Sequence, residues 1–394
     1  MPASPRTARA LNDRLALRLL QQEGPLTAGQ LKELTGLSRP TVADLVERLT
    51  ASGLVTMVGE SGEQRRGPNA RLYGLVADRA HLAALDVRTD SVSLVVSDLL
   101  GRVLGRAVAP VGGDTGTEDA VQRAVSLVER VAGEAGAGPL HTVGIGAPGL
   151  IDPATGELRD TTGLPEWHRN LVAALQQRMP EARFSVENET NLAALAEQRD
   201  GAARDRDTFV LLWLGHGTGA AVVLDGVLRR GASGGTGEIG FLPVPGTGGL
   251  PSATGCDGGF HSLAGSSAIA ELAAGYGVAG EAAAHEPAAA GPVRRAAADD
   301  SPEAARFLGA LADRLAVGAA SVVAVLDPGC VVLGGEVGQA GGERLAELVR
   351  DRLRRMSPLP TEVRPSPLGG TAVLRGALLT ARDRAQEELF TTVR

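Results

Sequence analysis

The residue types best suited to recognition chemistry lie in the first turns of one short helix that Ser38 is expected to cap. Ser38, Arg39 and Thr41 fall in its opening turn, and Arg48 lies further along the same polar face. Hydroxyl and guanidinium groups at the start of a helix reach base edges and phosphates when the helix enters the major groove of duplex DNA. This pattern predicts a DNA recognition helix.

Two helices joined by a tight turn are expected to position these side chains. Thr27 and Gln30 form a capping box at the start of the first helix, and Gly36 supplies the left-handed residue that ends it. Ser38 then caps the second helix, whose first turn tolerates Pro40. Thr27, at the start of the first helix, is also assigned to the DNA contacts. The buried face of the second helix is Val42, Leu45, Val46 and Leu49.

The flanking segments complete a winged helix. Leu11, Leu15 and Leu19 predict a preceding helix that packs through this stripe. Residues 54–58 and 71–75 read as a hairpin, and Arg65 and Arg66 in its loop are assigned to phosphates or the minor groove. A small helical domain without DNA affinity is the alternative, but the caps, the exposed Ser-Arg-Thr start and the basic loop together favour DNA binding.

Charge is distributed unevenly along the chain. Residues 1–80 hold eleven Lys or Arg and eight Asp or Glu, whereas the 394-residue chain carries a net charge of −7. A mildly basic head on an acidic body fits a DNA module joined to a domain that does not touch DNA. Aromatic residues make up only 3% of the chain, which argues against a stacking platform for single-stranded nucleic acid.

Bulk composition predicts a cytoplasmic protein with no membrane partner. No run of about 18 apolar residues is present, and the first residues lack the apolar core of a signal peptide. Two cysteines, Cys256 and Cys330, provide no disulfide framework.

The remainder of the chain predicts an α/β body. Three consecutive strands, a helix and a strand ending in a glycine turn occupy residues 81–149, and a similar series of strands begins at residue 208. We therefore expect a head over residues 1–78 and a body over residues 79–394, the body being a duplicated α/β domain with a cleft between its halves. An ordinary α/β domain with chance internal similarity remains the alternative.

Three stretches carry a resemblance to transcriptional regulators of the ROK family (repressors, open reading frames and sugar kinases). They are VGIGAPGLID at 143–152, ENETNLAALAE at 187–197 and VLDGVLRRGASGGTGEIG at 223–240. The resemblance, which also includes the winged helix, implies an actin-like, sugar-kinase-like body of two lobes. It further implies a sugar-type ligand in the cleft and a homodimer or homotetramer.

Kinase chemistry is expected to be lost. A kinase of this fold holds ATP phosphates on two glycine-rich turns, but here Asp86 is followed by Val87-Arg88-Thr89-Asp90, with no glycine. The second turn, residues 215–219, is better preserved. Glu189 stands where the family has a catalytic Asp, which displaces the carboxylate. No catalytic residue is assigned, and ATP is not expected as a cofactor.

A structural zinc ion is not expected either. The resemblance requires a His directly after Gly-Glu-Ile-Gly and a cluster of cysteines. Phe241 replaces that His, and Cys256 is the only cysteine of the cluster. One thiolate cannot complete a tetrahedral zinc site, so no metal ligand is assigned.

The resemblance assigns ligand contacts to Asn188, Glu189 and Glu238, whose amide and carboxylate groups suit the hydroxyls of a polyol. His261 falls where the family has a sugar-binding Glu, and Gly163 where it often has an Asn. Asn188 and Glu238 as ordinary caps or loop anchors, and His261 as a solvated or core histidine, are the alternatives.

These residues together predict a DNA-binding transcriptional regulator. Its operator binding would be controlled by a sugar or sugar phosphate, with repression favoured over activation. The competing hypotheses are a ROK-type sugar kinase with a DNA-binding head and a ligand-independent DNA-binding protein.

Overall fold

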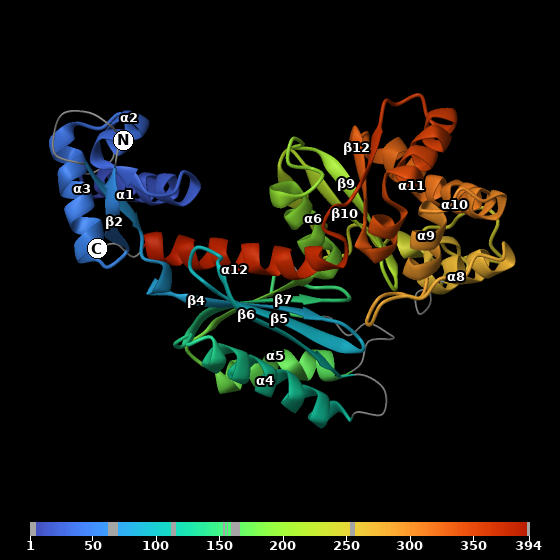
Figure 1. Cartoon of the computed structure of the whole chain (residues 1–394), viewed down its shortest axis with the longest axis horizontal. Helices are drawn as coiled ribbons and strands as arrows, with labels where there is room; N and C mark the ends of the chain where they lie inside the picture. The colour runs from blue at the N-terminus through green and yellow to red at the C-terminus, as the bar shows by residue number, and fades with distance from the viewer. Residues whose placement is uncertain are drawn as a thin grey trace.

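The molecule consists of a small helical head and a body of two α/β lobes joined by a long C-terminal helix (Figure 1). The computed structural model describes residues 5–61, 70–111, 116–152, 154–155, 157–158, 166–252 and 257–391. The predicted fold class, a winged helix followed by a two-lobed body, is confirmed.

The head is three helices and a three-stranded sheet of order β1-β3-β2. Thr27 and Gln30 form the predicted capping box, and Gly36 ends α2 with a φ of 68°. Ser38 caps α3, whose four predicted core residues are all buried. The elements are α1 Pro5–Gln22, β1 Leu26–Thr27, α2 Ala28–Thr35, α3 Arg39–Ala51, β2 Val55–Ser61 and β3 Ala70–Leu75.

The packing face predicted for the first helix is confirmed at Leu19, which packs against the head core, and is wrong at its other two residues. Leu11 and Leu15 are exposed, and the residues of α1 in the head core are Ala16, Leu17 and Leu20. Helical spacing permits either stripe, and the buried one includes Asp13, which binds Arg48 of α3. The ion pair and the apolar core therefore share one face of α1.

The first lobe is a five-stranded sheet of order β6-β5-β4-β7-β8, in which an antiparallel meander is extended by two parallel strands. Helices α4 and α5 cover one face and α12 crosses the other (Figure 1). The short helix η1 Ala77–Arg79 links this lobe to the head, and the predicted domain boundary falls within it. The elements are β4 His81–Val87, β5 Ser91–Asp98, β6 Val103–Pro110, α4 Thr117–Glu134, β7 Leu140–Ala147, α5 Trp167–Arg178, β8 Arg183–Asn188 and α6 Glu189–Asp200.

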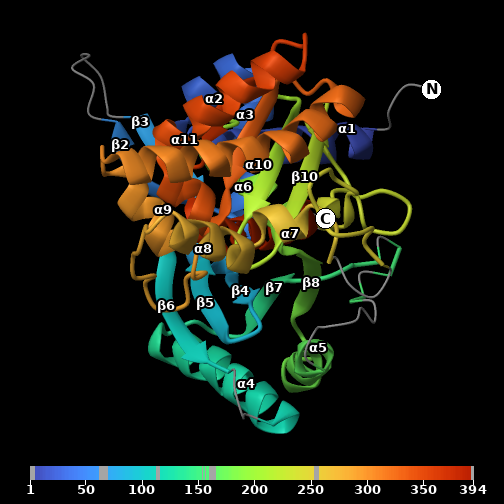
Figure 2. The same ribbon diagram turned by 90° about the vertical axis from the view of Figure 1, so that its right-hand side faces the viewer.

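The second lobe repeats this topology. Its sheet order, β11-β10-β9-β12-β13, again places three antiparallel strands before two parallel ones, so the predicted duplication is confirmed. Figure 2 shows its helices gathered on one side of the sheet. The elements are β9 Phe209–Leu214, β10 Thr218–Leu224, β11 Val227–Arg229, η2 Ile239–Phe241, α7 His261–Ala264, α8 Ser266–Gly275, α9 Ala290–Ala297, α10 Pro302–Leu326, β12 Cys330–Gly334, α11 Gly335–Met356, β13 Glu362–Pro365, η3 Gly369–Thr371 and α12 Ala372–Thr391.

Helix α10 is long and apolar enough, by length and composition, to cross a membrane. Its apolar residues, among them Phe307, Leu311 and Leu315, are buried in the core of the second lobe. The helix is therefore accounted for as a core element of this fold.

Helices α6 and α12 pack in the layer between the two sheets, and α12 continues to the head (Figure 1). Phe390, near its C-terminal end, is 4% exposed and belongs to the head core with Leu17 and Leu49. Arg14 of α1 pairs with Glu387 of α12. One helix thus connects the lobes physically to the head.

Candidate DNA interface and ligand cleft

The start of α3 presents its polar side chains to solvent. Ser38 and Arg39 are exposed, and Thr41 is partly exposed. Ser38 Oγ accepts a hydrogen bond from the Thr41 backbone N at 3.4 Å and lies 2.8 Å from Thr41 Oγ1. Arg39 has no hydrogen bond or ion pair within the described part of the chain, so its charge is free to meet an external anion.

Arg48 lies in a different environment from Arg39. Its Nη2 atom is 2.6 Å from Asp13 Oδ1, and its Nη1 atom pairs with Asp44. The Asp13 side chain is only 4% exposed. Since both guanidinium edges are already bound, the structure assigns Arg48 to holding α1 against α3, and we withdraw it from the predicted DNA contacts.

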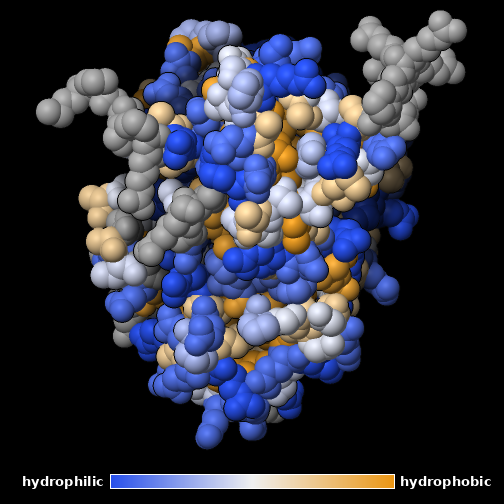
Figure 3. All heavy atoms as spheres, turned by 90° about the vertical axis from the view of Figure 1, so that its left-hand side faces the viewer, coloured by the Kyte–Doolittle hydropathy of each residue, from blue (hydrophilic) through white to orange (hydrophobic). Residues whose placement is uncertain are grey.

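Thr27 is also committed to local structure. Its backbone N donates to Gln30 Oε1 at 2.9 Å, and its hydroxyl accepts from the Gln30 backbone N at 3.2 Å. Arg65 and Arg66 lie outside the described residues. The face of the molecule that carries the head is largely hydrophilic, with smaller apolar patches (Figure 3).

The turn after β4 and the turn between β9 and β10 stand where a kinase of this fold holds ATP phosphates, and they come together at a cavity of ≈ 190 Å³. Arg88 and Glu189 of the first lobe meet Gly215, His216 and Glu336 of the second lobe there. The spatial pairing of the two turns follows from the repeated topology, since each turn ends the first strand of its sheet.

Arg88 fills the space between the two lobes. Its Nε atom donates to Asp86 Oδ2 at 3.0 Å and its Nη1 atom to Glu336 Oε1 at 2.6 Å. Its Nη2 atom donates to the carbonyl of Gly370 at 3.1 Å. Burial lowers the pKa of this guanidinium, but the two carboxylates raise it by more, so Arg88 stays charged. The first turn thus has a charged arginine side chain, bound within the protein, where a kinase has glycines that leave room for phosphate.

The cleft contains more carboxylates than cations. Asp86 is 2% exposed and Glu336 is 6% exposed. Burial and the neighbouring charge of Asp86 raise the pKa of Glu189 to about 7. Burial likewise raises the pKa of Asp86. A triphosphate entering this space would meet three carboxyl groups and one arginine that already has partners, an unfavourable setting for multiple negative charges.

Asn188 serves mainly as a helix cap. Its Oδ1 atom accepts from the backbone N atoms of Thr190 and Asn191 at the start of α6, and its Nδ2 atom donates to the Gly149 carbonyl at 2.9 Å. Both polar atoms of this side chain therefore have the structural role that the sequence offered as the alternative. We no longer count Asn188 among the sugar contacts.

Glu187, which the sequence analysis did not single out, joins the two lobes. Its Oε2 atom lies 2.6 Å from Arg230 Nε, which follows β11 of the second lobe. Its Oε1 atom accepts from Asn191 Nδ2 at 3.0 Å. The signal was present, because Glu187 opens the ENETN stretch, but nothing in the sequence indicates its distant partner.

Glu238 and His261 belong to the second lobe, and neither is among the described residues that line the cavity between the turns. Glu238 is exposed just before η2, and its charge contributes to the raised pKa of Glu189. His261 begins α7 and is partly buried. A Cβ atom placed on Gly240 would lie 3.8 Å from His261 Cβ, so the two segments are in contact. Gly237, with a φ of 92°, packs where any side chain would overlap the Ala220 carbonyl.

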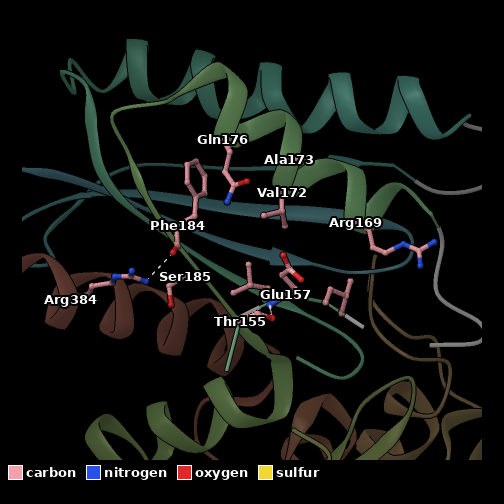
Figure 4. Close-up of a pocket in the computed structure, with 11 residues that line it drawn as sticks. Thr155, Glu157, Arg169, Val172, Ala173, Gln176, Phe184, Ser185 and Arg384 are labelled. Carbon is pink, nitrogen blue, oxygen red and sulfur yellow. Dashed lines mark hydrogen bonds between the residues drawn. The ribbon is translucent and has the colours of Figure 1, made fainter. Parts of the chain in front are cut away.

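A larger cavity, of ≈ 500 Å³, lies on the first lobe between α5, β8 and α12 (Figure 4). Arg169, Gln176 and Arg384 contribute polar groups, and Arg384 Nη1 donates to the Phe184 carbonyl at 2.9 Å. None of the predicted ligand residues lines it. The smaller cavity between the turns is therefore the one that matches the sequence motifs.

The segment where the family has a zinc cluster is described only in part. Phe241 is 40% exposed at the position of the expected His, and Cys256 and Gly163 lie outside the described residues. Within the described ranges no three His, Cys, Asp or Glu side chains are grouped to hold a metal ion.

The fold and the cleft together define a class of protein: a winged-helix head joined to a two-lobed body of the sugar-kinase type, with two turns facing each other across the cleft. The chain belongs to the ROK family, whose sequence profile matches residues 82–384. A profile of the MarR family matches residues 11–67, the head.

Relatives include both repressors and kinases. The chain is 25% identical to the xylose repressor of Caldicellulosiruptor bescii over 236 residues, 59% of each protein. It spans about three-fifths of the length of that repressor. It is 32% identical to the glucokinase of Thermotoga maritima over 310 residues, which covers 75% of this chain and 95% of the glucokinase.

Solved structures show the same two groups. A ROK family transcriptional regulator described as a homologue of the E. coli MLC protein matches 98% of both chains with a TM-score of 0.76 at 21% identity, a likeness of fold. A ROK glucokinase from Streptomyces griseus in complex with glucose and AMPPNP has a TM-score of 0.63 at 25% identity and covers 77% of this chain.

Proposed function

We propose that this protein is a DNA-binding transcriptional repressor whose operator binding is controlled by a sugar or sugar phosphate held in the body. The observation that carries the proposal is the exposed, unpaired Arg39 at the start of a well-capped α3 in a winged-helix head. Relatives named xylose repressor and N-acetylglucosamine repressor support the same function. On DNA, Ser38, Arg39 and Thr41 contact the operator, with Arg65 and Arg66 of the wing on the backbone.

Helix α12 is the route by which we expect ligand and DNA to influence each other. At one end, the Gly370 carbonyl just before α12 accepts a hydrogen bond from Arg88 in the cleft. At the other end, Phe390 packs in the head core. A ligand that changes the separation of the lobes changes the position of this helix and of the head. Sugar and DNA affinities are then linked reciprocally.

Glu189, Glu238 and His261 are the proposed ligand contacts. Glu189 lines the cavity. The charge of Glu238 acts on Glu189, and His261 lies against Gly240, two residues after Glu238. Glu189, whose pKa is raised to about 7, can either donate or accept a hydrogen bond near neutral pH, which suits the hydroxyl groups of a sugar.

A ROK-type sugar kinase is the second candidate, favoured by the glucokinase relative at 32% identity. A carboxyl with a pKa near 7 also suits a general base. Against this, Arg88 occupies the space between the two turns and is bound to Asp86 and Glu336. We therefore propose that the protein has no sugar kinase activity and needs no ATP.

The decisive experiment recovers the genomic fragments that the full-length protein binds and repeats the binding with a panel of sugars and sugar phosphates. We expect a two-fold symmetric operator, bound by a homodimer or homotetramer, that is released by one ligand. Glu238→Ala should bind the same fragment but no longer respond to the ligand. Binding to no fragment would overturn the proposal.

Two further assays separate the alternatives. Phosphorylation of a monosaccharide above the uncatalysed rate would favour the kinase. A thermal shift across the same panel addresses the ligand-independent protein, because a ligand that binds only the folded state raises the melting temperature. DNA binding with no shift for any sugar would favour ligand-independent binding.

A further inference from the structure

A cavity of ≈ 860 Å³ lies between the head and the body and shares no lining residue with the cleft between the lobes. The end of α1, the turn before β1 and the β2–β3 hairpin form its head wall. The turn after β5, the end of α6 and the middle of α12 form its body wall. Its volume lies in the range of small-molecule sites, which often occur at domain interfaces.

The cavity has an apolar lining from both walls. Leu20 and Leu75 of the head core are 3% and 6% exposed and line it. Val58 of the head and Leu100 of the body line it while remaining 49% and 42% exposed. Large apolar side chains that remain open to solvent beside a cavity favour an apolar group of a ligand.

The charged groups at this cavity are predominantly positive. Among the described residues that line it, Arg199, Arg204 and Arg382 are basic and Asp200 is the single acid. Asp200 is already bound to Arg375, Nε to Oδ2 at 2.5 Å. Arg199 and Arg382 share Asp383, at 3.0 Å and 3.4 Å.

Two guanidinium groups at the cavity have hydrogen-bonding capacity left. Arg204 has neither a hydrogen bond nor an ion pair in the portion of the chain that is described. Arg382 donates only one hydrogen bond among the described residues, from Nη2 to Asp383 at 3.4 Å, so its Nη1 atom is left to donate. Unmet donors on cations favour an anionic acceptor.

We propose that this cavity binds a small organic anion, a carboxylate, sulfonate or phosphate attached to an apolar body. The anionic group meets Arg204 and Arg382, and the apolar part lies against Leu20, Leu75 and Leu100. Such a ligand touches head and body at once, so its affinity depends on their relative position. It is a second effector site, independent of a sugar in the cleft.

The test uses 8-anilinonaphthalene-1-sulfonate, an apolar anion whose fluorescence rises on binding, with the full-length protein. We expect one saturable site per chain. Arg204→Glu should weaken binding about tenfold or more, since it removes a charge-assisted contact and adds a repulsive one. Arg204 is exposed, so this variant should fold normally. Arg295→Glu, a charge reversal on the exposed face of α9, is the matched control and should bind as the parent does.

Competition then tests the sign of the charge. Hexanoate should displace the probe, whereas hexylammonium, of similar apolar length, should not. Binding without saturation, unchanged affinity in Arg204→Glu or equal displacement by both competitors would each overturn the proposal. Neither DNA nor sugar is present in this experiment, so its outcome is independent of the proposed repressor function.

Discussion

Arg39 in the head and Arg88 in the cleft are the same side chain in opposite environments. Arg39 is exposed at the start of α3 and has no partner in the described residues, whereas Arg88 is bound by Asp86, Glu336 and the Gly370 carbonyl. The head therefore offers its charge to an external polyanion. In the cleft, the charge of Arg88 is neutralised by carboxylates of the protein itself. These bonds link the two lobes at the position where a kinase would hold phosphate.

The difference shows that local residue type does not decide the role of an arginine. Arg48, on the same helix as Arg39, resembles Arg88 because it binds the buried Asp13. What separates the two classes is whether a buried carboxylate lies within reach. The following predictions test that contrast, beginning with the largest expected effect.

Arg88→Met should cost about 4 kcal/mol of unfolding free energy, because it leaves two buried carboxylates without a counter-ion. Urea unfolding at pH 8 measures the loss. Arg39→Met is the matched control and should change stability by less than about 0.5 kcal/mol. Adding Asp86→Asn and Glu336→Gln to Arg88→Met should restore much of the stability. An Arg88→Met protein as stable as the parent would show that the interlobe ion pair does not stabilise the fold.

Phe390→Ala should destabilise the head by about 3 kcal/mol, the order expected for deleting a buried aromatic side chain. It should also weaken the response of DNA binding to ligand, because α12 loses its hold on the head core. Hydrogen exchange of the head amides measures the first effect. Met356→Ala, at an exposed apolar residue of α11, is the control. Parent-like protection of the head in Phe390→Ala would contradict the assigned contact.

Glu189 should make stability depend on pH. Its pKa is about 7 in the folded protein against an ordinary value of 4.5, so the folded state holds the proton more tightly. Its contribution to the free energy of unfolding is most favourable below pH 4.5 and is lost progressively as the pH rises to about 7. The loss should be about 2 kcal/mol after allowance for partial exposure.

Comparison of the parent with Glu189→Gln isolates this group. The difference in melting temperature between the two proteins should shift in favour of Glu189→Gln from pH 5 to pH 7 and stay constant above pH 8. Equal pH profiles for the two proteins would show that Glu189 ionises normally.

Arg39→Ala should weaken operator binding by about 1.5 kcal/mol, roughly tenfold, without affecting folding. Arg48→Ala should show the reverse order of effects, with its main loss in the stability of the head, because Asp13 is left buried and unpaired. Gel shifts and thermal unfolding of both variants measure the two quantities. Equal loss of DNA affinity in both, with stability unchanged, would return Arg48 to the DNA interface.

Much of the fold was predictable because its signals are local. The capping box at Thr27, the turn at Gly36 and the stripe from Val42 to Leu49 each involve residues within one or two helical turns. Strand β4 begins at His81, as predicted, and β9 begins at Phe209, one residue after the predicted start of the second series of strands. The stripe on α1 was not predictable, since two faces of that helix have similar apolar content and only packing against α3 and α12 distinguishes them.

The candidate site was predictable only in part. Glu189 was singled out by its motif, but its pKa is raised by burial and by carboxyl groups from segments about 50, 100 and 150 residues away in sequence. Arg88 binds Glu336, 248 residues further along the chain, and Glu187 binds Arg230, 43 residues further along. Sequence spacing carries no information about such pairs.

The sequence by itself determined that this chain has a winged-helix head, a duplicated α/β body and a first turn without glycine, because caps, alternation and turn chemistry act between near neighbours. Only the tertiary structure decided which arginines are free, which carboxylates share a buried space and that the last helix of the body completes the core of the head. Those features depend on charged groups that folding brings together from distant parts of the chain. Electrostatic interactions between such groups are strongest where they are buried away from water.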